Sequence, residues 1–292
     1  MAYASVAVVT RTKNRPLLLK RAIASVLAQT YTDWIMVIAN DGGDPKVVED
    51  VCHSFGSQFE GKYVLVHNAT SMGVEQAGNL GALGCDSEYI AQLDDDDTYQ
   101  PEFLETCVDY MRNSKLPELG GVITHWHEIW EKIEGDRVIK VSQSTNTRLQ
   151  FISFYEMSFR CTIIPASFFY LRSAWEKAGR YNTSLHFGDW DFALRFLSHY
   201  EIGVIPKPLA NYHRRTTTAC NNSVQAFPNL LQHATDRTRN NFLREDLKQG
   251  RCGLGMLMAL SHQLSQTSFW QLLKRDLSLF KRRWLYSSEG AQ

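Results

Sequence analysis

The sequence predicts an α/β fold in which a Rossmann-like, doubly wound and mostly parallel sheet is followed by a helical C-terminal appendage. Two observations lead to this fold class. Between residues 6 and 93, short apolar segments of strand length alternate with segments that repeat apolar residues at helical spacing. After about Asn221, the chain shows helical spacing without further strand-like runs. Regular alternation of strands and helices is typical of a parallel sheet with helices on both faces.

The first strand is the β-branched run Val6–Thr10, which leads through the polar loop "RTKNR" to Pro16. Proline is favoured in the first turn of a helix, so a helix is expected to begin there. The next apolar run, "WIMVIA" at Trp34–Ala39, is predicted as a second buried strand and ends in the turn-forming residues "NDGGDP". Further alternating elements are expected at residues 45–55, 63–67, 74–83 and 89–93.

The pattern becomes less regular from about Gly121, where several aromatic-rich stretches follow one another. A helix is expected around Trp175, another after the turn in "FGDWDFALRFL", and a strand in "IGVIPKPLANYHRR". We therefore divide the chain into a domain of residues 1–220, whose two halves meet near residue 100, and a helical extension of residues 221–292.

Composition and charge favour a globular protein of a reducing compartment. Of the 292 residues, 44% are hydrophobic, which is enough for one large domain with an appendage. Lys plus Arg and Asp plus Glu both number 31, so no net positive field favours nucleic acid as a partner. The six cysteines lie far apart without metal-binding spacing, and no secretory signal or membrane-length apolar run is seen. We expect a cytoplasmic location.

Polar residues follow three of the predicted strands, at the ends where parallel sheets bind their ligands. They are Arg11, Asp41 and the run Asp94–Asp97. Four adjacent carboxylates repel one another by about 4 kcal/mol per close pair at an effective dielectric constant near 20, so a compensating charge or water is needed. An extended chain would place Asp94 and Asp96 on one side and Asp95 and Asp97 on the other.

One such face can hold a cation. Carboxylates are hard ligands, and a site with few protein ligands and open positions suits Mg²⁺ or Mn²⁺ better than a closed calcium cage. The alternative is a solvated acidic loop, or a negatively charged cap for a helix that starts near Pro101.

Three ordered motifs make the chain recognisable. The stretches "VAVVTRTKNRPLLLKRAIASVLAQTYTDWIMVIANDGG", "GNLGALGCDSEYIAQLDDDDTYQPEFL" and "GDWDFALRF" together resemble family-2 glycosyltransferases of the GT-A fold, over about Ser5–Arg215. This resemblance implies inverting transfer of a sugar from a nucleoside-diphosphate sugar to an acceptor hydroxyl, with Mn²⁺ or Mg²⁺ as cofactor. It also implies that residues up to about 100 bind the nucleotide and that residues 101–220 bind the acceptor.

The resemblance assigns roles to residues at the strand ends. The positions that contact the nucleotide in the family are matched by Arg11, Thr12, Asp41, Asn79, Asp94 and Asp95. Asp96 matches the metal ligand, and His213 matches, two residues out of register, a late histidine that binds the metal in some relatives; a structural histidine is the alternative. Arg214 and Arg215 would clamp the diphosphate, or form a solvated basic turn.

Asp189 matches the general base, as the second member of the Glu-Asp pair of the family. Glycine replaces the expected glutamate at Gly188, so the acceptor contact of that residue is in question. Asp191 is the competing carboxylate, and its alternative role is an ion pair with Arg195 one helical turn later.

The substrates are less defined than the reaction. Asp41 suits the imide N–H of uracil, so a UDP-sugar is the preferred donor. A glycan or lipid-linked glycan of a bacterial surface polysaccharide is the expected acceptor, by family habit. Two other functions stay open: a sugar-nucleotide nucleotidyltransferase, although "RTKNRP" lacks the glycine of its usual loop, and a non-catalytic nucleotide-sugar binding module.

A basic amphipathic helix is expected between Phe269 and Trp284. Such a helix can lie on the anionic inner face of a membrane, which would make the protein peripheral there. The alternative is docking of its apolar stripe on the rest of the chain or on a second copy.

Overall fold

The structure, a computed structural model, describes residues 3–185, 188–215 and 228–266. The chain divides into two compact units, Met1–Arg237 and Thr238–Gln292. The domain boundary expected at residue 220 lies outside the described residues.

Four parallel strands form the first half of the sheet, in the order β3-β2-β1-β4. They are β1 (Val6–Thr12), β2 (Trp34–Asp41), β3 (Tyr63–Asn68) and β4 (Tyr89–Gln92). Thr12 pairs with Asn40 and Asp41 with Asn68, so the carboxyl ends of these strands lie at one edge. β1, β2 and β4 are buried along their whole length, because both faces of this sheet are covered.

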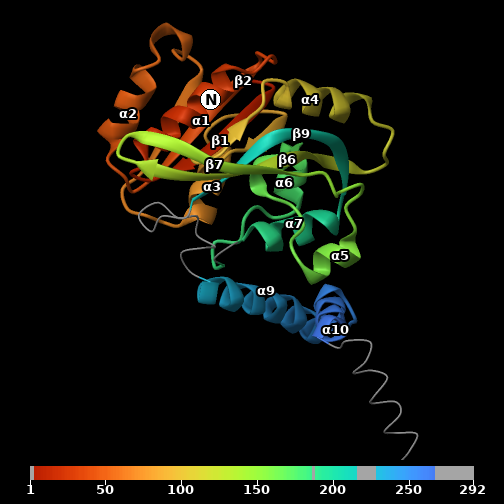
Figure 1. The fold of residues 1–292 in the computed structure, drawn as a ribbon. Coiled ribbons are helices and arrows are strands. Elements are labelled where there is room, and N and C mark those ends of the chain that lie inside the picture. Colours follow the sequence, from red (N-terminus) through yellow and green to blue (C-terminus); the bar gives the residue numbers. More distant parts are fainter. Residues whose placement is uncertain (1–2, 186–187, 216–227, 267–292) are drawn as a thin grey trace, which may run out of the picture. The chain divides into compact units, whose positions relative to one another are not determined.

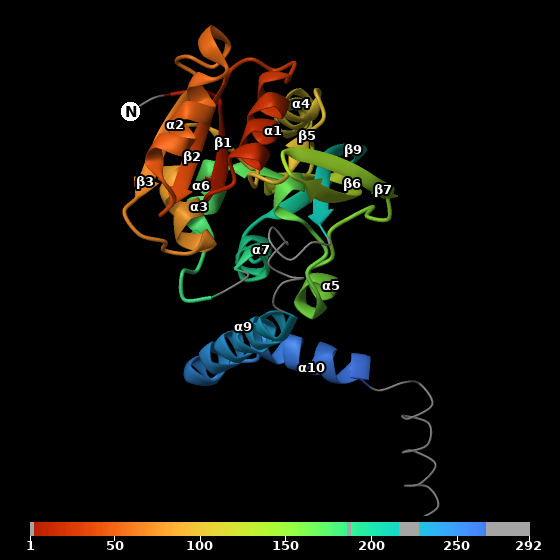
Figure 2. The ribbon, with the colours of Figure 1, turned by 60° about the vertical axis from the view of Figure 1, so that its left-hand side comes forward.

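Helices cover the two faces of the parallel strands, as the strand and helix alternation predicts (Figures 1 and 2). Val8 and Met36 point toward one face, where they share an apolar cluster with Ile23 and Phe103. The helices on that face are α1 (Pro16–Leu27), α2 (Pro45–His53) and α4 (Phe103–Asn113). The other face carries α3 (Val74–Leu83) and α7 (Asp189–Leu197), of which α7 packs Phe192 and Phe196 against the aromatic residues of β8. The α/β, doubly wound prediction is confirmed.

The second half of the sheet is mixed in direction. It consists of β5 (Thr98–Tyr99), β6 (Leu119–Glu134), β7 (Arg137–Asn146), β8 (Phe168–Leu171) and β9 (Glu201–Arg215). Strand β8 is antiparallel to both β4 and β6, whereas β6 and β9 run parallel. The short helices of this half are α5 (Phe154–Phe159), α6 (Arg172–Lys177) and the 3₁₀ turn Pro165–Ser167, whereas the 3₁₀ turn Gly56–Gln58 precedes β3 in the first half. Arg215 pairs with Glu131, so the parallel strands β9 and β6 come together close to their carboxyl ends.

Two glycines at the C-terminal end of α3, Gly81 and Gly84, face the sheet at positions where a side chain would not fit. A Cβ atom on Gly81 would lie 2.7 Å from Cγ1 of Val9, and one on Gly84 would lie 2.7 Å from Cγ1 of Val37. The close approach fixes the position of the first turn of α3 at the carboxyl edge of the strands.

The C-terminal unit contains the end of α9 (Pro228–Gln249) and α10 (Leu254–Gln266). Asp246 accepts hydrogen bonds from the N–H groups of Gly253 and Met256, at 3.1 and 2.9 Å, which joins the two helices. No helix among the described residues has the length and apolarity that crossing a membrane requires. The basic helix expected between Phe269 and Trp284 lies outside the described residues.

We expect Gly81→Ala to lower the free energy of unfolding by about 1–3 kcal/mol, because its methyl group would overlap Val9. Helix propensity alone would give a change of about 1 kcal/mol in the opposite direction. Gly78→Ala is the matched control, since its Cβ would make only an ordinary 3.5 Å contact with Arg11. Urea unfolding of both variants measures the difference, and equal stability would contradict the close packing of α3.

Candidate active site

The four aspartates after β4 form a turn, in which the N–H of Asp97 donates to the carbonyl of Asp94 at 3.0 Å. This turn brings carboxylate oxygens of Asp94, Asp96 and Asp97 within 4.8 Å of one another. The alternation expected for an extended chain is therefore wrong for Asp97, because the turn rotates it onto the side of Asp94 and Asp96. Asp95 alone points the other way.

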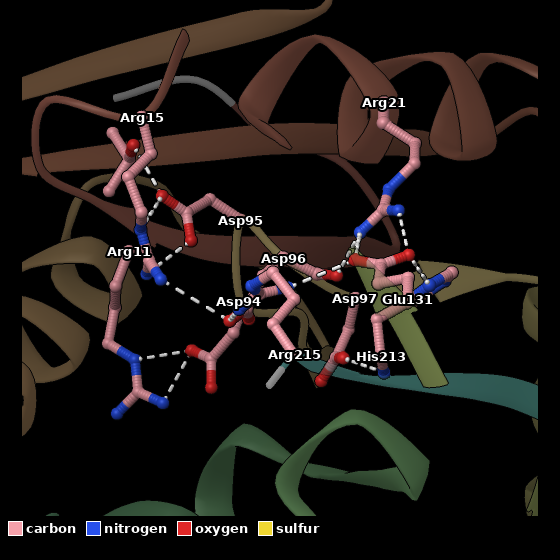
Figure 3. Close-up of polar contacts among 11 residues, drawn as sticks. Arg11, Arg15, Arg21, Asp94, Asp95, Asp96, Asp97, Glu131, His213 and Arg215 are labelled. Carbon is pink, nitrogen blue, oxygen red and sulfur yellow. Dashed lines mark hydrogen bonds and ion pairs between the residues drawn. The ribbon is translucent and has the colours of Figure 1, made fainter. Parts of the chain in front are cut away.

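The end of β1 and the loop after it hold the turn from one side (Figure 3). Nε of Arg11 donates to Asp94 at 2.8 Å. Asp95 accepts from the hydroxyl of Thr12 at 2.7 Å and from Nε of Arg15 at 3.0 Å. Arg11, Thr12, Asp94 and Asp95 thus meet, as predicted, but in this structure they bind one another.

Asp96 and Glu131 form a second, buried part of the site. Arg215 is fully buried and bridges the two carboxylates, binding Asp96 directly and Glu131 at 3.1 Å. Arg21 reaches Glu131 from α1 at 2.6 Å and donates to the backbone carbonyl of Asp96 at 2.5 Å. Burial alone would raise the pKa of Glu131, but hydrogen bonds from His213 and Arg21 lower it to about 2.

His213 is bound on both ring nitrogens. Nδ1 lies 2.9 Å from Glu131 and Nε2 lies 3.0 Å from the hydroxyl of Thr98, while its backbone N–H donates to Asp97. Burial lowers the pKa of the imidazole. These contacts are those expected of a structural histidine, the alternative role given above. To bind a metal, His213 would have to give up the hydrogen bond of one ring nitrogen.

The two arginines proposed as a diphosphate clamp point in opposite directions, because neighbouring residues of a strand alternate in direction. Arg215 faces the aspartates. Arg214 lies 3.4 Å from Glu128 and stacks over the rings of Trp130 and Tyr212. Of these two arginines, only Arg215 contacts the aspartate turn.

Asp41 organises the loop that leads into α3. Its carboxylate accepts four hydrogen bonds, from the side chains of Asn68 and Ser71 and the N–H groups of Met72 and Gly73, at 2.6–3.1 Å. Burial opposes them, yet these bonds lower the pKa of Asp41. A carboxylate has about four acceptor positions, so an incoming base N–H would have to displace one of these donors.

Asn79 binds the segment that leads to α7. Its amide donates to the carbonyl of Tyr181 at 2.9 Å and accepts from the N–H of the same residue at 3.0 Å. Asn79 therefore anchors Tyr181 in this structure, and its nucleotide contact stays a prediction.

The two candidate bases differ in their surroundings. Asp191 is buried and receives both Nε and Nη2 of Arg195, at 2.9 and 2.7 Å, which is the alternative role predicted for it. Asp189, at the start of α7, makes no such ion pair among the bonds described. Burial raises the pKa of Asp189 to about 6, although the charge of Arg11 opposes the shift. A carboxylate with that pKa is a stronger proton acceptor than an ordinary aspartate.

Sequence reasoning did not select Arg15, Arg21, Glu75 or Glu131. Arg21 could have been recognised from the sequence, because it lies one turn after Leu18 on the side of α1 that is otherwise apolar. Glu131 could not, since its role depends on the pairing of β6 with β9.

The donor set of the turn suits a divalent cation. Asp94, Asp96 and Asp97 offer three hard oxygen ligands. Burial raises the pKa of Asp95 and Asp97, and the negative charge of Asp96 adds to both effects. A bound cation would favour the charged forms of these acids.

Comparisons with known proteins agree with this fold. Residues 7–174 match glycosyl transferase family 2. A stretch of 125 residues is 33% identical to the glucosyl-dolichyl phosphate glucuronosyltransferase of Haloferax volcanii, covering 42% of this chain and 39% of that enzyme.

Two solved structures share the fold. The S. aureus TarS 1–349 complex with UDP-GlcNAc has a TM-score of 0.59 at 12% identity, covering 81% of this chain and 67% of that one. The Pyrobaculum calidifontis mannosyltransferase in complex with GDP-Man and Mn²⁺ has a TM-score of 0.55 at 14% identity, covering 94% and 85%. These likenesses show a fold of the GT-A class. The chain belongs to glycosyl transferase family 2.

We expect Glu131→Ala to lower the free energy of unfolding by about 3–5 kcal/mol, because Arg21 and Arg215 would lose a buried carboxylate partner. Glu134→Ala is the matched control on the same strand, since the side chain of Glu134 is 60% exposed and its ion pair at 3.8 Å is with Lys132, which is also exposed. The control should change stability by less than about 1 kcal/mol. Chemical denaturation tests this, and similar losses for both variants would contradict the central role of Glu131.

Proposed function

We propose that this protein transfers a sugar, with inversion, from a nucleoside-diphosphate sugar to an acceptor hydroxyl, and that Asp189 is the general base. One observation carries the proposal. Arg11 binds Asp94 of the acidic turn, and its charge also acts on Asp189, so the raised-pKa carboxylate lies near the residues that suit a metal-bound diphosphate. Inverting transfer needs both groups, one on each side of the anomeric carbon.

Each residue has a part in the proposed reaction. Asp189 takes the proton of the acceptor hydroxyl. At the same time, the oxygen of that hydroxyl forms a bond to the anomeric carbon, and the bond between this carbon and the diphosphate oxygen breaks. Asp94, Asp96 and Asp97 would hold Mn²⁺ or Mg²⁺, whose chemistry is to stabilise negative charge on the leaving diphosphate. Arg215 already neutralises Asp96 and can share its guanidinium with phosphate oxygens, for which its planar geometry is suited.

The donor is proposed to be a UDP-sugar, bound by the half of the domain up to about residue 100. The TarS structure supports a uridine nucleotide, and the Pyrobaculum structure, with GDP-Man, supports a guanosine one. Asp41 can select uracil over guanine only if one of the four hydrogen bonds that it accepts is replaced by a hydrogen bond from the base. A uridine preference therefore rests on one exchangeable contact.

The acceptor is proposed to be a glycan or a lipid-linked glycan of surface polysaccharide synthesis. The name of the Haloferax relative, an enzyme acting on glucosyl-dolichyl phosphate, supports a lipid-linked one. Such an acceptor would suit a cytoplasmic protein that touches the inner face of the membrane through the basic residues after Phe269.

We expect release of free nucleoside diphosphate from a sugar nucleotide when Mn²⁺ or Mg²⁺ is present, and loss of release with excess chelator. Asp96→Asn should reduce the rate by at least about 100-fold, because the variant loses a charged metal ligand. A phosphate-coupled assay over a panel of UDP-, GDP- and dTDP-sugars measures the release. Pyrophosphate as the product would instead indicate nucleotidyl transfer, and absence of turnover with every donor would indicate a binding module.

We expect Asp189→Asn to lower kcat by at least about 100-fold while donor affinity changes little, because an amide cannot accept the proton. In the wild type, kcat/KM should fall as the pH drops below about 6, where Asp189 becomes protonated. Asp191→Asn is the comparison. This variant should be less stable, because Arg195 loses its carboxylate partner, but its kcat/KM should still fall below about pH 6 as in the wild type. Sugar transfer by Asp189→Asn at the wild-type rate would move the base elsewhere.

A further inference from the structure

A second carboxylate lies next to the candidate base, on a different helix. Glu75, in the first turn of α3, is only 4% exposed. Its Oε1 accepts a hydrogen bond of 2.9 Å from the N–H of Gly188, which is the N-cap residue of α7 and directly precedes Asp189. The glycines that bring α3 against the sheet place this side chain at the carboxyl edge.

The absence of a side chain at Gly188 is explained by Glu75 and not by the backbone. Gly188 has φ −68° and ψ −5°, which any residue can adopt. A Cβ atom there would lie 2.9 Å from Cγ and 3.5 Å from Oε1 of Glu75. The Glu75 carboxylate therefore fills the space that a side chain at residue 188 would otherwise occupy.

Glu75 also acts on Asp189 through its charge. Burial is the largest cause of the raised pKa of Asp189. The positive charge of Arg11 lowers this pKa, and the negative charges of Asp94 and Glu75 raise it. Among the described residues, Cys161, Tyr170 and Tyr181 also interact with Asp189, and burial raises the pKa of each, which keeps all three uncharged at neutral pH. Glu75 is thus an acid near Asp189 that does not belong to the proposed metal site.

We propose that Glu75 is a positioning residue for Asp189, supplying from α3 the carboxylate that residue 188 lacks. It holds the first turn of α7 through the Gly188 N–H and keeps a negative charge beside the base. The inference rests on the proposed function, because Asp189 is taken as the base. The competing role for Glu75 is structural only, as an acid that stabilises a helix N-terminus.

Glu75→Gln separates the two roles, because its amide oxygen can still accept the Gly188 N–H while the charge is lost. We expect an unchanged melting temperature and a pKa of Asp189 lower by at least about 0.5. Carboxyl-carbon NMR, assigned with Asp189→Asn, measures this pKa without any substrate. Glu105→Gln is the matched control, since Glu105 also lies in the first turn of a helix and accepts a hydrogen bond, from Thr30. An unchanged pKa in Glu75→Gln would overturn the proposal.

Transposing the carboxylate gives a second test. Glu75→Ala should lower kcat by about tenfold or more, and Glu75→Ala with Gly188→Glu should recover most of that loss. Gly188→Glu alone should lower the melting temperature, because its side chain would overlap Glu75. A folded double variant no more active than Glu75→Ala would overturn the inference. Failure of the proposed function would appear differently, as a wild type that releases no nucleoside diphosphate while the NMR shift in Glu75→Gln persists.

Discussion

Neutralisation of the acids that follow β4 is the constraint on which the site depends. Among the described residues of this network, the four carboxylates of Asp94, Asp95, Asp96 and Glu131 are held by four guanidinium groups, from Arg11, Arg15, Arg21 and Arg215, while Asp97 accepts the backbone N–H of His213. The arginines come from β1, the loop after it, α1 and β9. Because isolated buried charges are costly, these elements must meet before the turn can be stable. The acidic edge therefore adds a second link between the two halves of the sheet, which the backbone pairing of β4 with β8 already joins.

The same balance restricts how a donor can bind. Asp96 already has Arg15 at 3.3 Å and Arg215 as ion-pair partners, so a divalent ion entering by itself would add positive charge to a nearly neutral network. A cation that arrives with a diphosphate brings its own counter-charge. The arginines can then pass from carboxylate to phosphate without a net change in buried charge, which favours joint binding of metal and donor.

The sequence alone predicts the parallel half of the sheet well, because local periodicity defines each element. The helix at Val74–Leu83 and the convergence of Arg11 with the aspartate run follow from it. The rest depends on contacts far apart in the chain. Glu131 and Arg215 are 84 residues apart, and only the register of β6 and β9 joins them. Asp97 was misplaced for a local reason, since a turn and an extended chain give opposite side-chain directions.

The overlap between residues 75 and 188 also bears on how such a site can change over time. While a glutamate is present at position 75, a larger residue at 188 would clash with it, whereas a smaller residue at 75 leaves the backbone at 188 free to accept any side chain. Divergence from one arrangement to the other is therefore ordered: the residue on α3 must shrink first. Relatives that bear an acid directly before the aspartate equivalent to Asp189 should have a small residue at the position equivalent to Glu75 on α3.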